Sequence, residues 1–167
     1  SLAEDLQVAP NTIKKYMNIL QSLYIIFLIR PFHRNIARSL LKEPKVYFYD
    51  SGSVDGDEGL KLENSVAVCL LKHVQYLQDS RGKSISLNYI RTKEQKEIDF
   101  AISTKDKIET AIEVKLADKK PAPNVKYFKE RYPDIKFVQL VHNMKQPKEV
   151  NGIFISPAGD WLAELTA

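Results

Sequence analysis

The sequence predicts an α/β protein with a mixed sheet, preceded by a small helical module. Three observations favour this fold class. Residues 60–78 carry apolar side chains at helical spacing, and residues 97–103 and 109–116 are rich in β-branched and apolar residues on either side of a polar turn. Residues 2–22 have the rhythm of two short helices joined by a tight corner. A hydrophobic content of 44% is enough for a core, and a charged content of 28% argues against disorder.

The C-terminal part of the chain follows a regular order of predicted elements. A helix over residues 60–78 is followed by a strand over 87–91, a hairpin of 97–103 and 109–116, a helix over 125–132 and a strand over 135–142. A further strand over 152–156 and a short helix over 159–166 complete the order. The first of these helices is expected to turn one apolar stripe to the core: Leu62, Val66, Cys69, Leu70, Val74 and Leu77.

The first 50 residues are predicted to form a separate winged-helix module, with a second domain over residues 51–167. A helix beginning at Pro10 follows the corner, and two strands over 24–32 and 44–50 flank residues 33–43. Its inward face is expected to carry Ile13, Tyr16, Met17 and Leu20. Its outward face, where such a helix meets DNA, carries Asn11, Thr12, Lys14 and Lys15. The alternative is that this module packs against a neighbouring protein domain.

A split set of charged residues is the main functional signal. Asp99 lies on the first strand of the predicted hairpin, and Glu113 and Lys115 lie two residues apart on the second. Side chains alternate along a strand, so Glu113 and Lys115 point the same way, and an antiparallel hairpin brings Asp99 alongside them. Two neighbouring carboxylates suit a hard cation such as Mg²⁺ or Mn²⁺. The alternative is an ordinary surface ion pair.

These residues and the order of elements around them resemble the PD-(D/E)xK nucleases. The resemblance rests on an order of helix, three strands, helix and strand, and on Asp99 followed by Glu113 and Lys115. It implies a restriction-endonuclease-like fold in which the acidic residues bind the metal and Lys115 assists the attacking water. In that fold the first helix commonly supplies another acidic residue, which here falls on Glu63. The alternative for Glu63 is a favourable charge near the start of its helix.

A longer stretch, from Leu2 to about Ala117, resembles the C-terminal region of a large group of bacterial and archaeal AAA+-type ATPases. The resemblance is carried by the strings LEN, YIRTKEQKEIDFAI and IEVKLA, together with the first 52 residues. It implies that a preceding P-loop ATPase domain of the full-length protein binds ATP and is a partner of this region. It also places a phosphate-binding pair on Arg91 and Lys93. Departures are KLEN in place of the commoner LFEN, and a short segment between Asp50 and Glu63.

Two functions from different classes are therefore expected. The first is a Mg²⁺- or Mn²⁺-dependent nuclease that acts on DNA, with Glu63, Asp99 and Glu113 as ligands and Lys115 as the catalytic lysine. The second is a non-catalytic region that binds nucleic acid or a protein. A net charge of +4 permits contact with DNA without prescribing it. We expect a cytoplasmic location, no membrane span, and a chain that is a fragment of a longer protein, because it starts inside a helix without Met.

Overall fold

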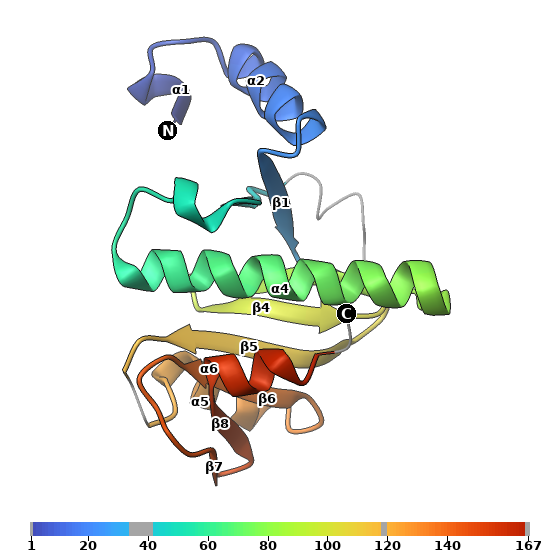
Figure 1. Ribbon diagram of the computed structural model, residues 1–167, viewed down its shortest axis with the longest axis vertical. Helices are drawn as coiled ribbons and strands as arrows, with labels where there is room; N and C mark the ends of the chain where they lie inside the picture. The colour runs from blue at the N-terminus through green and yellow to red at the C-terminus, as the bar shows by residue number, and fades with distance from the viewer. Residues whose placement is uncertain (1, 34–41, 118–119, 166–167) are drawn as a thin grey trace.

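The computed structural model describes residues 2–33, 42–117 and 120–165, with side chains from Glu4 onward. In these residues the chain forms one eight-stranded mixed sheet with the strand order β2-β1-β3-β4-β5-β6-β8-β7 (Figure 1). The strands are β1 Ile26–Pro31, β2 Lys45–Phe48, β3 Ser86–Arg91, β4 Glu97–Ser103, β5 Ile108–Lys115, β6 Lys136–Val141, β7 Lys148–Val150 and β8 Ile153–Pro157. The helices are α1 Leu2–Asp5, α2 Pro10–Ser22, the 3-10 turn η1 Ser51–Ser53, α4 Glu58–Arg81, α5 Pro123–Arg131 and α6 Ala158–Ala163.

The centre of the sheet changes from antiparallel to parallel at β5. Strands β3, β4 and β5 pair antiparallel, whereas β5, β6 and β8 pair parallel. The crossover from β5 to β6 is made by α5, as parallel strands require a long connection. The predicted order of helix, three strands, helix and strand is therefore present as α4, β3, β4, β5, α5 and β6. The edge strand β7 was not predicted, and the nuclease-like fold remains an expectation.

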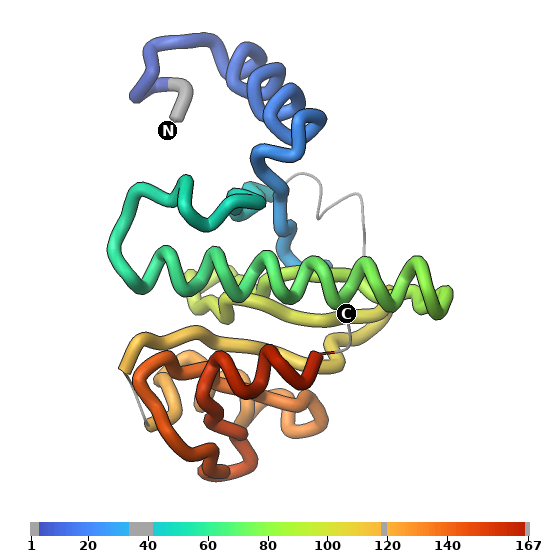
Figure 2. Tube along the Cα trace, in the orientation of Figure 1, coloured from blue at the N-terminus to red at the C-terminus, as the bar shows by residue number. Residues whose placement is uncertain are grey.

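Helices cover both faces of the sheet, and each face has its own core. On one face α4 and α6 pack over Phe100, Ile112 and Leu140, while on the other α5 contributes Val125 and Phe128. Figure 2 shows the long helix α4 running lengthwise along the segment that forms β4. Its start is fixed by the Asp57 side chain, which accepts a hydrogen bond from the Leu60 backbone N–H at 2.9 Å. Its end at Gly82 has a φ of 59°, a left-handed conformation that favours glycine.

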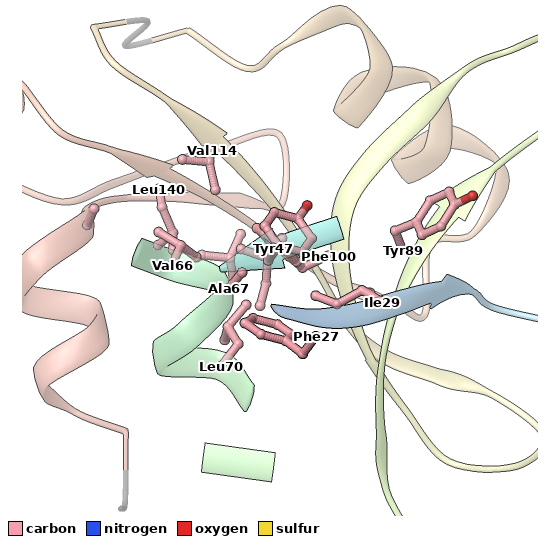
Figure 3. Close-up of a cluster of buried hydrophobic side chains, with 13 residues drawn as sticks. Phe27, Ile29, Tyr47, Val66, Ala67, Leu70, Tyr89, Phe100, Val114 and Leu140 are labelled. Carbon is pink, nitrogen blue, oxygen red and sulfur yellow. The ribbon is translucent and has the colours of Figure 1, made fainter. Parts of the chain in front are cut away.

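The N-terminal strands belong to the main sheet and share its core. Strand β1 pairs antiparallel with β2 and parallel with β3, through Arg30 with Asn88 and Pro31 with Tyr89. Figure 3 shows Phe27, Ile29 and Tyr47 of these strands converging with side chains of α4 and β4. The two strands predicted over 24–32 and 44–50 are thus present and contribute to the α4 face of the core, while the winged-helix module remains an expectation. Residues 34–41 of the segment between them lie outside the described residues.

Two predicted core placements were wrong. Tyr16 of α2 is 55% exposed, and α2 has no buried residue, because among the described elements its main contacts are with α1 and β1 and it does not pack on the sheet core. Cys69 of α4 is also exposed. The buried stripe of this helix includes Val66, Ala67 and Leu70, so it turns away from position 69. Within the part of the chain that the structure describes, no helix is long and apolar enough to cross a bilayer.

Candidate functional site

The hairpin of β4 and β5 places Asp99 next to Glu113. The last paired residues of the ladder are Phe100 and Ile112, so the next position along it sets Asp99 opposite Glu113. On its other side, β4 holds one more residue than β3 between the pairs Ile98–Ile90 and Ala101–Asn88, which is a bulge at Asp99 and Phe100.

The bulge explains how Asp99 leaves the regular ladder. Bulges commonly re-aim a side chain next to a functional site. Here the Asp99 carboxylate enters the space where the two strands part, and its Oδ2 accepts a hydrogen bond from the Val114 backbone N–H at 2.9 Å. The side chain therefore takes a bond that a backbone carbonyl of β4 would otherwise accept.

Glu113 is a buried carboxylate that is only half satisfied. The residue is 4% exposed, its Oε1 accepts a hydrogen bond from Lys115 Nζ at 2.8 Å, and its Oε2 has no hydrogen-bond partner in the part of the chain that the structure describes. Burial, followed by the charge of Asp99, raises the pKa of Glu113 to about 7. Burial would lower the pKa of the Lys115 ammonium, but the hydrogen bond to Glu113 raises it. The pair faces away from Val114, which lies in the α4 core, as strand alternation predicts.

Glu63 and Asp99 are bridged by a lysine that the sequence argument did not identify. Lys45 Nζ of β2 lies 3.1 Å from Glu63 Oε1, 2.8 Å from Glu97 Oε1 and 3.4 Å from Asp99 Oδ1. The hydroxyl of Tyr47, two residues along the same strand, donates to Glu63 Oε1 at 2.7 Å. We call Glu63, Glu97, Asp99 and Glu113 the acidic cluster.

The electrostatics of the acidic cluster depend on Lys45. Burial alone would lower the pKa of the Lys45 ammonium, but Asp99, Glu63 and Glu97 outweigh burial and raise this pKa. Burial would likewise raise the pKa of Glu97, yet Lys45 and Arg91 hold it below its usual value. For Asp99 the balance is reversed, because burial and the charge of Glu63 raise its pKa despite Lys45. Ionisation of Asp99 and Glu113 is therefore unfavourable in the folded protein, whereas ionisation of Glu97 is favourable.

Asn64 fixes the position of the strand that carries Lys45. This buried side chain accepts a hydrogen bond from the Phe48 backbone N–H at 2.8 Å and donates to the Phe48 carbonyl at 2.9 Å. Its amide also donates to Ser51 Oγ at 3.0 Å. Asn64 thus pairs with β2 as a neighbouring strand would, and it holds β2 against the first turns of α4. The string LEN indicated Glu63 as a site residue but gave no sign of the structural role of the asparagine that follows it.

Of the expected phosphate-binding pair, Arg91 contacts the acidic cluster, whereas Lys93 lies in the turn between β3 and β4. The Arg91 guanidinium bonds to Glu97 through Nε at 2.5 Å and lies 5.3 Å from the centre of the Tyr89 ring. Both basic residues line a cavity of about 970 Å³ between the β3–β4 turn and the C-terminal end of α5. Lys42, Lys107, Arg131 and Tyr132 also line this cavity, together with acidic residues.

The predicted DNA-contacting residues of the first module lie on another part of the molecule. Asn11, Lys14 and Lys15 are exposed and Thr12 is half-buried, all in the first turns of α2. Figure 1 shows this helix at one end of the molecule, beyond β1 and away from α5. The structure therefore does not bring them to the acidic cluster.

The residues present are compatible with a divalent cation at one position. In the described residues, no group of three or more His, Cys, Asp or Glu side chains is arranged to hold a metal ion. Glu63 is engaged by Lys45 and Tyr47, so its role as a ligand remains a prediction. Asp99 and Glu113 are adjacent, and Glu113 Oε2 is a hard oxygen donor that has no hydrogen-bond partner among the described residues. Mg²⁺ commonly takes one or two carboxylates and keeps several waters, which fits this pair.

Comparison with known proteins gives two family matches. The model of a domain of unknown function, DUF4143, matches residues 58–160, which is more than half of the chain. A second domain of unknown function, DUF8612, matches residues 1–55. The first of these domains is commonly associated with AAA-type ATPase proteins. No curated protein and no solved structure matches the chain.

Proposed function

This chain belongs to the DUF4143 family, and for its acidic cluster we propose a Mg²⁺- or Mn²⁺-dependent hydrolysis of phosphodiester bonds in DNA. The observation that carries the proposal is the pair formed by Asp99 and Glu113, in which one buried carboxylate oxygen has no partner and Lys115 is bonded to the other. Two carboxylates and one lysine at the opening of a strand pair suit phosphoryl chemistry better than a structural ion pair, which would leave no oxygen unsatisfied.

Asp99 and Glu113 are the residues that would hold the cation. When bound there, Mg²⁺ supplies an activated water and neutralises charge on the phosphoryl oxygens. The chain contributes the preorganisation of both ligands. The Val114 N–H fixes the Asp99 carboxylate, and burial within β5 fixes Glu113. Because both ligands stand on strands, their separation is set by the sheet.

Lys115 is placed to act on the water or on the phosphate. Its side chain is 38% exposed, and its ammonium is bonded to Glu113. Lys115 can therefore contact a water or a phosphate from the solvent while it remains bonded to the carboxylate. It can donate to the attacking water and to a developing negative charge on the phosphate. Arg91 contacts Glu97 of the acidic cluster and lines one cavity with Lys93, and the two would hold a neighbouring phosphate. In the reaction the water oxygen bonds to phosphorus, and the phosphorus–oxygen bond to the leaving nucleotide breaks.

The direct test is cleavage of duplex and single-stranded DNA by the purified chain, with and without its ATPase domain. We expect products with Mg²⁺ or Mn²⁺ and none with EDTA. Glu113→Gln and Lys115→Ala should each abolish cleavage while the circular dichroism spectrum stays unchanged. Lys148→Ala, at an exposed lysine of β7, is the matched control and should cleave normally. Cleavage that survives both site substitutions would contradict the proposal, as would its absence when the ATPase domain is restored.

A non-catalytic role is the second candidate, and the bridging of the acidic cluster by Lys45 favours it. An ammonium bonded to three carboxylates is also what a purely structural cluster would contain. In this case the chain binds nucleic acid or docks a protein, and α2 is the element exposed for contact. Duplex DNA affinity should then fall steeply with salt and after Lys14→Ala and Lys15→Ala. Binding that ignores salt would indicate a protein partner instead.

A further inference from the structure

We propose that Lys45 is a built-in competitor for the divalent cation, so that the acidic cluster accepts metal only when this ammonium withdraws. The inference rests on the proposed function, because it concerns loading of the same pair of ligands. It assigns a regulatory role to a residue of β2, which lies in the stretch matched by DUF8612, at a site built mainly from the stretch matched by DUF4143.

The geometry shows that the ammonium already occupies a cation position. Lys45 Nζ contacts carboxylate oxygens of Glu63, Glu97 and Asp99 within 3.4 Å. Its side chain is only 18% exposed, and the rings of Tyr89 and Phe100 lie 5.7 and 6.0 Å away. A bound metal cation would likewise be surrounded by several carboxylate oxygens, so the Lys45 ammonium occupies the kind of position that a metal ion would occupy.

Asp99 is the residue over which the two cations compete. Its Oδ2 accepts the Val114 N–H and its Oδ1 faces Lys45, so neither oxygen is free of a donor. Lys45 Nζ lies 3.4 Å from Asp99 Oδ1, so a divalent cation shared between Asp99 and Glu113 would lie close to the ammonium. The two positive charges would repel each other strongly in this buried environment. Lys45 retains Glu63 and Glu97 as partners after it leaves Asp99. Metal binding would therefore replace the contact of Lys45 with Asp99 and leave its contacts with Glu63 and Glu97 in place.

The position of β2 sets which arrangement is held. Asn64 bonds to both backbone groups of Phe48, and β1 pairs with β2 from Ile26 to Ile29. A shift of this strand moves Lys45 directly, because the lysine is the first residue of β2. Loading of the site is thus tied to a segment outside the β4–β5 hairpin that holds Asp99 and Glu113.

The test measures Mn²⁺ affinity of the whole chain by calorimetry, independently of any cleavage. Lys45→Met keeps the length of the stem between the two rings and removes the charge. We expect it to bind Mn²⁺ at least about tenfold more tightly than the wild type, the scale on which groups around a site change metal affinity. Lys148→Met, at an exposed lysine of β7, is the matched control, since it makes the same change away from the acidic cluster. Its affinity should equal that of the wild type.

A second measurement needs no substitution and covers a variant that fails to fold. Reductive methylation of the wild type, followed by mass spectrometry, reports how accessible each lysine is. Lys45 should be modified faster at saturating Mg²⁺ than in EDTA, since the amine then keeps two of its three carboxylate partners. The exposed Lys148 should react at the same rate in both conditions.

The possible outcomes separate this inference from the proposed function. Equal Mn²⁺ affinity of wild type and Lys45→Met would overturn the competition and leave the metal site in place. Unchanged protection of Lys45 at saturating Mg²⁺ would overturn it in the same way. If neither protein binds Mn²⁺, both the competition and the proposed function are wrong. Loss of binding in Asp99→Asn, with tight binding in Lys45→Met, would support both.

Discussion

Replacing Glu113 with glutamine should stabilise the protein at pH 8 and have little effect near pH 4.5. The pKa of this carboxyl is about 7, whereas that of an unfolded glutamate is about 4.5. The folded state therefore holds this proton more tightly than the unfolded state does. Its contribution to stability is complete below about pH 4.5 and is lost as the pH rises to about 7. Glutamine has the same shape and no charge to bury, so the variant avoids this loss.

The size of the effect follows from the pKa difference. That difference corresponds to about 3 kcal/mol at pH values above 7, and we take this as the upper limit because Asp99 shares the same environment. For a chain of this length, a change of 1 kcal/mol moves the melting temperature by about 2–4 °C, so a gain of up to about 6–12 °C is expected at pH 8. Lys115 loses its partner, but its ammonium is partly exposed and can turn to water at little cost.

Thermal and urea unfolding from pH 4.5 to 8.5 in EDTA would measure this difference. Glu109→Gln, an exposed position on the same strand, is the control and should follow the wild type at every pH. A raised pKa of Glu113 would be contradicted if Glu113→Gln showed the same dependence of stability on pH as the wild type, or if it were less stable than the wild type at pH 8. With Mg²⁺ in place of EDTA, the wild type alone should gain stability at pH 8.

Two further substitutions test the supports of the site. Asn64→Ala leaves the Phe48 backbone groups unpaired, and urea unfolding should show a loss of about 2–4 kcal/mol together with faster hydrogen exchange in β2. Equal exchange in β2 would contradict the role of Asn64. Gln139→Leu should cost a similar amount, about 2–4 kcal/mol, because the buried amide accepts from the Ala122 N–H and donates to the Lys120 carbonyl. Gln139→Leu should also speed hydrogen exchange at the Ala122 amide. Val138→Ala is the control, since it removes buried methyl groups and lowers stability without affecting that amide.

Features encoded within a short stretch of sequence could be predicted. The apolar spacing of α4 and the two β-rich runs of β4 and β5 specify their own elements, and the two-residue separation of Glu113 and Lys115 specifies that they share a face. Membership of Asp99 in the same site followed from the hairpin. These relations need no knowledge of the rest of the fold.

Features that depend on distant pairing could not be predicted in this way. The bulge at Asp99 arises from pairing with β3, and no residue in β4 requires it. Lys45 reaches Glu63 and Asp99 across 18 and 54 residues of sequence, because β1 and β2 extend the sheet beyond β3 and share its core with α4. The two-residue separation of Lys45 and Tyr47 predicts that their side chains lie on the same face of a strand. It does not predict that this face meets Glu63. Cys69 was wrongly predicted to be buried. The apolar spacing of α4 is satisfied by a face centred on Cys69 as well as by one centred on Ala67, and the sequence does not distinguish the two.

The shared core of β1, β2 and α4 means that the boundary between the two family matches is not a boundary of the fold. A protein that begins at residue 58 would lack Phe27, Ile29 and Tyr47, which are 6%, 2% and 5% exposed in the whole chain. Their removal would uncover an apolar patch on the sheet and leave several carboxylates without their ammonium. Such a fragment should therefore self-associate, and its metal affinity would not represent that of the intact chain. The smallest unit for experiments on this site includes β1.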